Sequence, residues 1–365
     1  MLFDELTWPE VAALPRQLPL VLPLGDGYEW AQLEFGSSQW ARLPCLHYGW
    51  PGSAIAVAPQ LFDRVLRDVF RGLQQDGFSA LTLLHPRGLH FDLPGVTCRA
   101  VDVMTFPGHL AGLDHEHVVL LPLGHTEQHG HHLPLSTDTL IIDAIAREVV
   151  QSSPQSATSL PVLPYGVSTH RRTFAGTFNL DGRTYEDFLL AVIGELIVRG
   201  ADRFYLLNGH GGNHSFLVNV AKFAGERFPQ AFTATSWLHT AGAIGSAALQ
   251  RLRRSSRGGM GHAGELETAL MLHLHPGLVH MERVVDETDF IASEHFYMDW
   301  IEGGELIANP PWTDDTQTGS YGAGSLATAE NGAHWLEAAV KEKRMHVRAI
   351  HEQQDRRRLR RAGQR

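Results

Sequence analysis

Residues 118–138 read VVLLPLGHTEQHGHHLPLSTD and join an apolar run to a segment rich in histidine and acidic residues. The apolar residues 118–123 predict a buried β-strand. Open parallel sheets bind ligands outside the carboxyl ends of their strands, which is where the polar segment would lie. Glu127 and His129 are two residues apart and would project to the same side of an extended segment. Carboxylate and imidazole ligands without thiolates are typical of Zn, Mn or Fe(II) sites. A histidine-rich surface loop is the alternative.

Two further segments of the chain are also rich in histidine, glycine and other polar residues. Residues 203–214, RFYLLNGHGGNH, run from an apolar strand into a turn whose glycines let the backbone pass close to a ligand. A phosphate-binding loop is the competing interpretation, but the lysine of a P-loop is missing. Residues 261–268, GHAGELET, open another helical segment. Three such loops predict one converging site rather than three coincidences.

The chain between residues 101 and 340 alternates strand and helix patterns. We expect strands near 118–123, 158–163, 203–207 and 231–236, and helices near 139–151, 184–199, 214–227 and 265–274. Buried apolar strands that alternate with helices predict an α/β fold with a parallel sheet covered on both faces. Residues 284–325 predict a long irregular connection, and loops of that length often shape a substrate pocket.

The motifs, taken together, resemble those of the creatininase family of metal-dependent amidohydrolases. In chain order they are E-x-H-G-x-H-L-P-L-x-x-D, N-G-H-G-G-N and H-A-G-E-x-E-T, beginning at Glu127, Asn208 and His262. Residues 174–180 resemble that family's F-P-G-T segment, with Ala175 in place of the proline, and residues 324–332 match its usual ending. The resemblance covers roughly residues 101–340 and is specific in its combination of motifs. It implies a three-layer α/β/α fold with a mainly parallel sheet.

The resemblance also implies two divalent metal ions per subunit, with Zn, Mn and Fe as the candidates. By position, Glu127, Asp138 and His210 would hold one ion. His129 and Asp138 would hold the other, so Asp138 is expected to bridge the two ions.

One position departs from the family pattern. Creatininase itself has a further glutamate ligand two residues after the motif histidine, and this chain has Gly212 there. The missing ligand must come from elsewhere, with Glu267 as the first candidate and Glu265 as the second. The departure also puts creatinine in doubt as the substrate.

The chemistry follows from two cations held close together. Such a pair lowers the pKa of a shared water from ~16 toward ~7 and supplies hydroxide for attack on a carbonyl carbon. The leaving nitrogen needs a proton, which a histidine beside the metals can donate. His262 resembles the family's acid/base histidine, and we predict His262 and Glu267 as the catalytic residues. A packing histidine at a helix start is the alternative for His262.

Other side chains are candidates to support the metal ligands or to face the substrate, since metal-bound imidazoles usually need an outer partner. These are His125, His131, His132, His170 and His214. A solvated loop histidine is the alternative for each. Trp237 follows an apolar strand and would either line the pocket or pack in the core.

The composition is that of a globular enzyme: 43% of the 365 residues are apolar and 19% are charged. No apolar run approaches the ~20 residues that span a bilayer, and no signal segment is evident. Net charge is −10, which argues against a general nucleic-acid surface. Only two cysteines, Cys45 and Cys98, are present, which rules out a disulfide framework and predicts a cytoplasmic protein.

Residues 1–100 predict a degenerate repeat of the same unit, with chance similarity of two strand–helix units as the alternative. LPLVLPLG at 18–25 echoes VVLLPLG at 118–124, and a helix near 61–74 is again followed by an apolar strand. When Gly25 is aligned with Gly124, the ligand positions hold residues that cannot replace the ligands, so we expect no metal in this half. These residues are Tyr28, Trp30 and Arg87, opposite Glu127, His129 and His210.

Three parts are thus predicted: the repeat at 1–100, a catalytic unit at 101–340 and a basic helical tail at 341–365. We predict a hydrolase of a small, non-peptide, cyclic amide that forms a homo-oligomer. Hydrolysis of a lactone or a cyclic polyol ketone at the same two-metal site is the alternative reaction. A non-catalytic, metal-stabilised scaffold is the alternative outside the enzymes.

Overall fold

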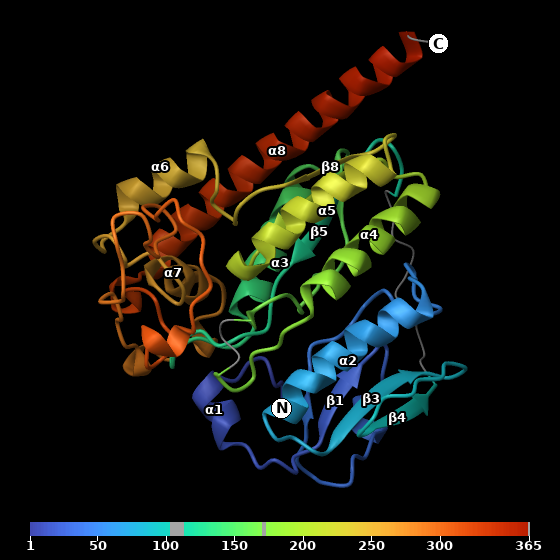
Figure 1. Ribbon diagram of the computed structural model, residues 1–365, viewed down its shortest axis with the longest axis vertical. Helices are drawn as coiled ribbons and strands as arrows, with labels where there is room; N and C mark the ends of the chain where they lie inside the picture. The colour runs from blue at the N-terminus through green and yellow to red at the C-terminus, as the bar shows by residue number, and fades with distance from the viewer. Residues whose placement is uncertain (103–112, 170–172, 364–365) are drawn as a thin grey trace.

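The computed structural model describes residues 1–102, 113–169 and 173–363. They form two separate parallel sheets of four strands each (Figure 1). The first sheet has the order β2-β1-β3-β4 and the second the order β6-β5-β7-β8. The strands are β1 (Leu20–Pro23), β2 (Ala41–Arg42), β3 (Leu81–Pro86), β4 (Val96–Val101), β5 (Val118–Leu123), β6 (Ala157–Ser159), β7 (Arg203–Asn208) and β8 (Phe232–Thr235).

Helices cover both faces of the second sheet. The helices of the chain are α1 (Trp8–Ala13), α2 (Pro59–Gln75), α3 (Thr137–Ser152), α4 (Gly182–Val198), α5 (His214–Arg227), α6 (Ala243–Leu252), α7 (Glu265–Leu274) and α8 (Ala329–Gly363). Strand β5 is buried along its whole length, because Val119 and Leu121 face a core shared with α4 and α5, while Val118 and Leu120 face a core shared with α3, α7 and α8. The predicted three-layer α/β/α fold with a parallel sheet is confirmed.

The strand predicted at 158–163 is shorter than expected, since β6 ends at Ser159. Pro161 and Pro164 lie in and just after the rest of that range and carry no N–H for a sheet hydrogen bond. Leu163 still forms an isolated bridge to Leu123, so the chain continues alongside β5.

The two sheets have matching connectivity and matching register. In each sheet the strands lie in the order second, first, third, fourth. Pro23 of β1 pairs with Leu84, and Pro122 of β5 pairs with Leu207. Counting onward from these pairs places Arg87 opposite His210, in agreement with the alignment predicted from the sequence.

The segments after β2 and β6 extend this match. Residues 43–49 read LPCLHYG and residues 160–166 read LPVLPYG. Leu46 bridges to Leu24 just as Leu163 bridges to Leu123. The fold therefore contains two α/β units of one topology.

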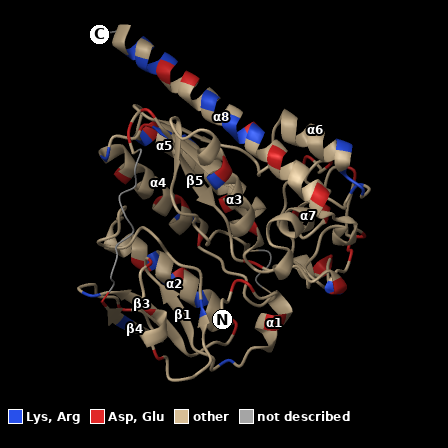
Figure 2. Ribbon diagram, turned by 180° about the vertical axis from the view of Figure 1, so that it is seen from behind, with Lys and Arg blue, Asp and Glu red and all other residues tan. Residues whose placement is uncertain are grey.

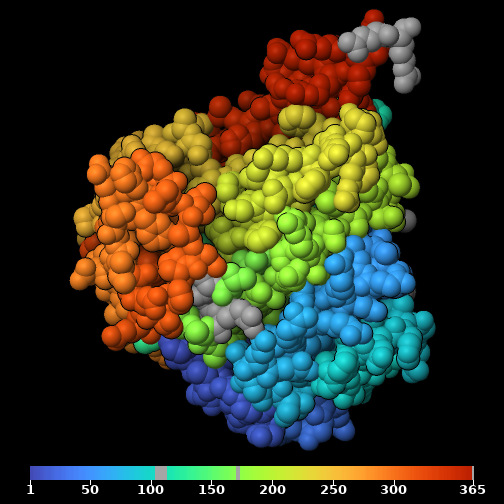
Figure 3. Space-filling model, in the orientation of Figure 1, coloured from blue at the N-terminus to red at the C-terminus, as the bar shows by residue number. Residues whose placement is uncertain are grey.

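The units share one apolar core in which α2 packs against α4. Figure 3 shows the atoms of the N-terminal unit packed directly against those of the unit that contains β5–β8. Arg64 of α2 forms an ion pair of 2.7 Å with Asp187 of α4. The amides of Leu135 and Ser136 donate to the carbonyl oxygens of Leu6 and Asp4, both at 2.9 Å, so the N-terminal segment also holds the loop before Asp138.

Helix α8 continues without a break through the predicted boundary at residue 340. Its first half packs on the unit that contains β5–β8, and its last turns, which are rich in Arg, extend beyond the body of the molecule (Figures 1 and 2). Among the described residues, no helix is both long and apolar enough to cross a membrane.

Candidate metal centre

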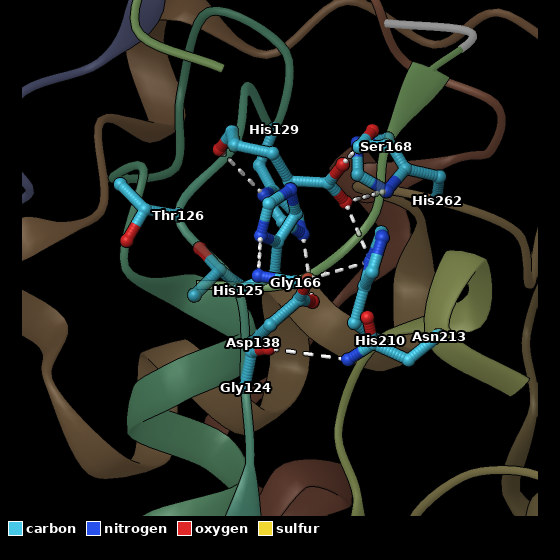
Figure 4. Close-up of polar contacts among 12 residues, drawn as sticks. Gly124, His125, Thr126, His129, Asp138, Gly166, Ser168, His210, Asn213 and His262 are labelled. Atoms are coloured by element: carbon cyan, nitrogen blue, oxygen red, sulfur yellow. Dashed lines mark hydrogen bonds and ion pairs between the residues drawn. The ribbon is translucent and has the colours of Figure 1, made fainter. Parts of the chain in front are cut away.

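Six of the predicted site residues meet at the carboxyl ends of β5 and β7, and Figure 4 shows four of them, His129, Asp138, His210 and His262. The six are Glu127 and His129 from the loop after β5, Asp138 from the first turn of α3, His210 after β7, and His262 and Glu267 at the start of α7. All six are buried. Gly124 allows α3 to begin this close to the strand end, because a Cβ there would lie 2.6 Å from the Cα of Thr139.

Asp138 lies at the centre of the cluster. Its Oδ1 is 3.1 Å from Nε2 of His129, and its Oδ2 is 3.0 Å from Nδ1 of His210. Oε1 of Glu127 is 3.1 Å from the same nitrogen of His210. The two oxygens of one carboxylate thus face two different imidazoles, which is the arrangement expected of a bridging ligand.

Backbone carbonyl groups fix which ring nitrogen of each histidine faces the cluster. A carbonyl oxygen can only accept, so the ring nitrogen next to it must carry the proton. Nδ1 of His129 donates to the Glu127 carbonyl at 3.1 Å, and Nε2 of His210 donates to the Val167 carbonyl at 3.0 Å. Nε2 of His262 lies 2.8 Å from the Gln128 carbonyl oxygen and 3.2 Å from the side-chain amide nitrogen of Gln128, and the shorter contact favours a proton on Nε2. The opposite nitrogen of each ring points at carboxylate oxygens.

Those inward nitrogens need a cation between themselves and the carboxylates. A ring lone pair that faces a carboxylate is repulsive unless a proton or a metal ion lies between them. Burial alone lowers the pKa of His129, but Asp138 and Glu267 outweigh burial and raise it. Burial would raise the pKa of Asp138, but His129 and His210 hold it well below its usual range. The donor set therefore suits divalent cations of the Zn or Mn type.

Glu267 extends the cluster on the side of His129. Its Oε2 is 3.8 Å from Nε2 of His129 and 3.9 Å from Nδ1 of His262. The same oxygen accepts the amide of Ala263 at 2.6 Å. Ala263 has a φ of 52°, in the left-handed region that side chains rarely occupy, and this strained turn brings His262 and Glu267 to the same side.

Glu265 is placed differently. Its carboxylate accepts the backbone amides of Arg254 and Ser255 at 2.7–3.1 Å, and it belongs to none of the potential ligand clusters among the described residues. Gly212 leaves no room for a side chain, since a Cβ there would lie 2.3 Å from the carbonyl oxygen of Val167 and 2.5 Å from Nε2 of His210. A glutamate at 212 would require this loop to move.

The other predicted histidines divide by position. His125 groups with Glu127 and His210, and its Nδ1 accepts the Gly166 amide at 2.9 Å. His132 is turned away toward Thr268, and burial lowers its pKa to about 4. His131 lies against the ring of Trp8, at 5.3 Å between centroids. His214 lies against Trp237, and His170 is outside the described residues.

Aromatic side chains stand beside the cluster. Trp237 is half-buried and contacts Trp300 at 5.8 Å between ring centroids, next to the turn at Gly211. Trp312 lies 5.0 Å from the ring of His262. Trp300 and Trp312 both belong to the connection at 284–325, so that connection contributes to the surroundings of the site.

Ser168 was missed by the sequence analysis. Its hydroxyl donates to Oε2 of Glu127 at 2.8 Å and leaves Oε1 facing His210. Residues 164–169 carry no motif of their own, and only the path of the chain after β6 brings Ser168 to this position.

Comparison with known proteins agrees with this geometry. The family model described as creatininase, creatinine amidohydrolase, matches residues 102–345. Creatinine amidohydrolase from Pseudomonas putida is 33% identical over 183 residues, which cover 46% of this chain and 68% of that protein. The mycofactocin precursor peptide peptidase of Mycobacterium ulcerans is 35% identical over 173 residues, which cover 46% of this chain but only 62% of that protein. The 3-dehydro-scyllo-inosose hydrolase of Thermotoga maritima is 26% identical over 246 residues, which cover 61% of this chain and 74% of that protein.

Solved structures show the same similarity. A manganese creatininase matches with a TM-score of 0.52 and 28% identity, covering 64% of this chain and 91% of that one. A creatininase variant of Zn–Zn type matches with a TM-score of 0.51 and 28% identity, covering 64% and 90%. The resemblance predicted from the motifs is confirmed.

Proposed function

The chain belongs to the creatininase family of hydrolases, and on that premise we propose that it uses two divalent ions to hydrolyse a small, non-peptide, cyclic amide. The observation that carries the proposal is the position of Asp138, whose two oxygens face His129 and His210 at 3.1 and 3.0 Å. A single-metal site would not need both oxygens of one buried carboxylate directed at separate imidazoles.

The ligands divide into two overlapping sets. We assign Glu127, Asp138 and His210 to one ion and His129, Asp138 and Glu267 to the other, in keeping with the close approach of their donor atoms. When bound, the ions lower the pKa of a shared water and polarise the substrate carbonyl. We favour Glu267 over Glu265 because the Glu265 carboxylate is engaged by backbone amides.

His262 is the proton donor in this proposal. With Nε2 held by the Gln128 carbonyl, its Nδ1 lies 3.7 Å from Oε1 of Glu127 and 3.9 Å from Oε2 of Glu267. A proton carried by Nδ1 can pass to the leaving nitrogen. The Trp312 ring packs on the imidazole and restrains its rotation.

The surroundings support a compact substrate. Trp237, Trp300 and Trp312 are rigid, flat side chains near the cluster, and such residues suit a small ring better than an extended chain. A cyclic polyol ketone is the second candidate, because the inosose hydrolase aligns over more of this chain than the creatinine and mycofactocin enzymes do. A scaffold without activity would have no need of this complete ligand set.

We also propose that the protein acts as a cytoplasmic homo-oligomer, as the family resemblance implies, without nucleic-acid or membrane partners. Size-exclusion chromatography with light scattering tests the oligomeric state. Mass above that of one chain is expected.

The function is tested by assay of the purified protein after chelation and reloading with Mn or Zn. The panel contains cyclic amides, a linear peptide, lactones and inosose-type ketones. We expect metal-dependent turnover of a cyclic amide and no turnover by Asp138→Ala. Preferred cleavage of the peptide or the ketone would change the proposed substrate class but leave the proposed two-metal hydrolysis in place. Two bound metals without turnover of any substrate would favour the scaffold.

A further inference from the structure

A second group of potential metal ligands lies at the carboxyl edge of the N-terminal sheet. Asp26 follows β1, and Cys45 and His47 follow β2. Parallel sheets bind ligands at this edge, and the catalytic cluster occupies the corresponding edge of the second sheet. Tyr28, Trp30 and Arg87 align with the metal ligands of the other unit and cannot replace them, so we predicted no metal in this half of the chain. Asp26, Cys45 and His47 lie at other positions.

The three donors are close enough to share one ion. Nδ1 of His47 is 2.9 Å from Oδ2 of Asp26. A ligand atom from each of Asp26, Cys45 and His47 lies within 4.8 Å of the other two. The Cys45 thiol donates to the carbonyl oxygen of Gly25 at 3.1 Å, and both described cysteines are free. A tetrahedral zinc ion makes contacts of about 2.0–2.3 Å to each donor.

The donors are specific to the N-terminal unit. In the matched segments after β2 and β6, Cys45 stands opposite Val162 and His47 opposite Pro164. The catalytic unit therefore has no thiol or imidazole at these two places. The N-terminal unit lacks ligands at the aligned positions and carries polar donors at others.

The cluster also opens onto a cavity of about 300 Å³ between the two units. His47 is 24% exposed and Asp26 is 62% exposed, so solvent and ions can reach them. Arg42 lines the same cavity, and its guanidinium stacks on the Trp30 ring at 5.0 Å. Thr139, the residue after Asp138, also lines this cavity.

We propose that Asp26, Cys45 and His47 form a separate zinc site, with the fourth coordination position open to the cavity. Thiolate, imidazole and carboxylate are all established zinc ligands, and three protein ligands with one open position are typical of accessible zinc sites. The thiolate favours zinc over manganese, which prefers oxygen donors. The site is independent of the function proposed above, because it shares no ligand with the catalytic cluster.

Cobalt substitution of the full chain tests the site. Thiolate ligation of Co(II) gives a near-ultraviolet charge-transfer band, and the ligands assigned at the catalytic centre include no thiolate. We expect the band in the wild type at one cobalt equivalent beyond the catalytic ions. Cys45→Ser should abolish the band, and His47→Ala should reduce or abolish it. Cys98→Ser, which changes the other cysteine, is the matched control and should keep it.

A second measurement does not depend on the folding of variants. Zinc should strongly slow alkylation of Cys45 in the wild-type protein, as read by peptide mass spectrometry, and leave Cys98 unaffected. Asp138→Ala should keep the cobalt band, which separates failure of this site from failure of the catalytic one. A wild type without the band, a band that survives Cys45→Ser, or zinc protection only at millimolar concentration would overturn the proposal.

Discussion

The N-terminal and catalytic units have one strand order and one register but differ in the segment after their first strand. After β5 the chain forms a ligand loop and then α3, which carries Asp138 in its first turn. After β1 it forms only a short 3-10 turn at Trp30–Gln32, and the aromatic rings of Tyr28, Trp30 and Trp40 pack beside the sheet. Restoring Glu and His at positions 28 and 30 would therefore not restore the site, because no helix supplies the bridging carboxylate.

Removal of the Asp138 carboxylate, which the N-terminal unit lacks, should have the largest effect. Asp138→Ala should release both ions and reduce turnover by well over ~100-fold, because the carboxylate serves both sites and offsets the repulsion between two cations. His210→Ala should empty mainly one site and leave about one ion bound. Elemental analysis per folded chain measures both effects. Two tightly bound ions in Asp138→Ala protein would refute the bridging role.

Removal of residues 1–100 tests whether the N-terminal unit is structurally dispensable. We expect aggregation or a changed oligomeric state, because the deletion exposes the face of α4 that packs against α2. It also removes the hydrogen bonds to Leu135 and Ser136, just before Asp138, so metal content should fall. Light scattering and metal analysis of the fragment 101–365 give the answer. A monodisperse, fully active fragment with the assembly of the full chain would show that the unit is dispensable.

Two substitutions in α7, Glu267→Gln and Glu265→Gln, test which glutamate takes the place of the ligand missing at Gly212. Glu267→Gln should weaken metal binding by ~10-fold or more, because it replaces a charged ligand with a neutral amide. Glu265→Gln should leave metal content unchanged and lower the melting temperature instead, since its carboxylate accepts the amides of Arg254 and Ser255. Competition with a chromophoric chelator measures the affinities. Wild-type metal binding in both variants would assign the position to water or another side chain.

The smallest expected effect concerns α8, an element that the N-terminal unit lacks. Burial lowers the pKa of Lys343 to about 8 from 10.5, although Glu342 opposes this shift. Between these pH values the unfolded chain binds more protons than the folded chain, so the free energy of unfolding rises with pH by up to roughly 1.4 kcal/mol per unit from this group. Chemical denaturation between pH 8 and 10 measures the slope. Lys343→Met should have a shallower slope, and an unchanged slope would contradict a lowered pKa of Lys343 in the folded chain.

The sequence predicted the fold through local patterns. Apolar runs such as 118–123, each followed by a helical period, were sufficient to predict a parallel α/β sheet. The alignment of Gly25 with Gly124 agrees with the register of the two sheets. The prolines at 161 and 164 shortened β6 because they remove sheet hydrogen bonds, an effect that apolar periodicity does not reveal. The three motifs likewise predicted that Glu127, Asp138 and the other candidate ligands lie close together.

The features that the sequence did not predict depend on contacts between distant segments. Ser168 reaches Glu127 across 41 residues of chain, and the crowding at Gly212 comes from a carbonyl oxygen at Val167. The grouping of Asp26 with Cys45 and His47 requires β1 and β2 to lie side by side. None of these pairs has a fixed spacing that a motif could encode.

The hydrogen bonds between three imidazoles and main-chain carbonyls have a consequence for how the protein loses and regains metal ions. The ring orientations at His129, His210 and His262 are set by the polypeptide itself, so the centre is preorganised and its shape does not depend on a particular ion. Demetallation should accordingly be reversible without refolding, and the bound metal would depend on which ions are available as much as on selectivity. The same molecule could then work with different ions as the availability of each one changes.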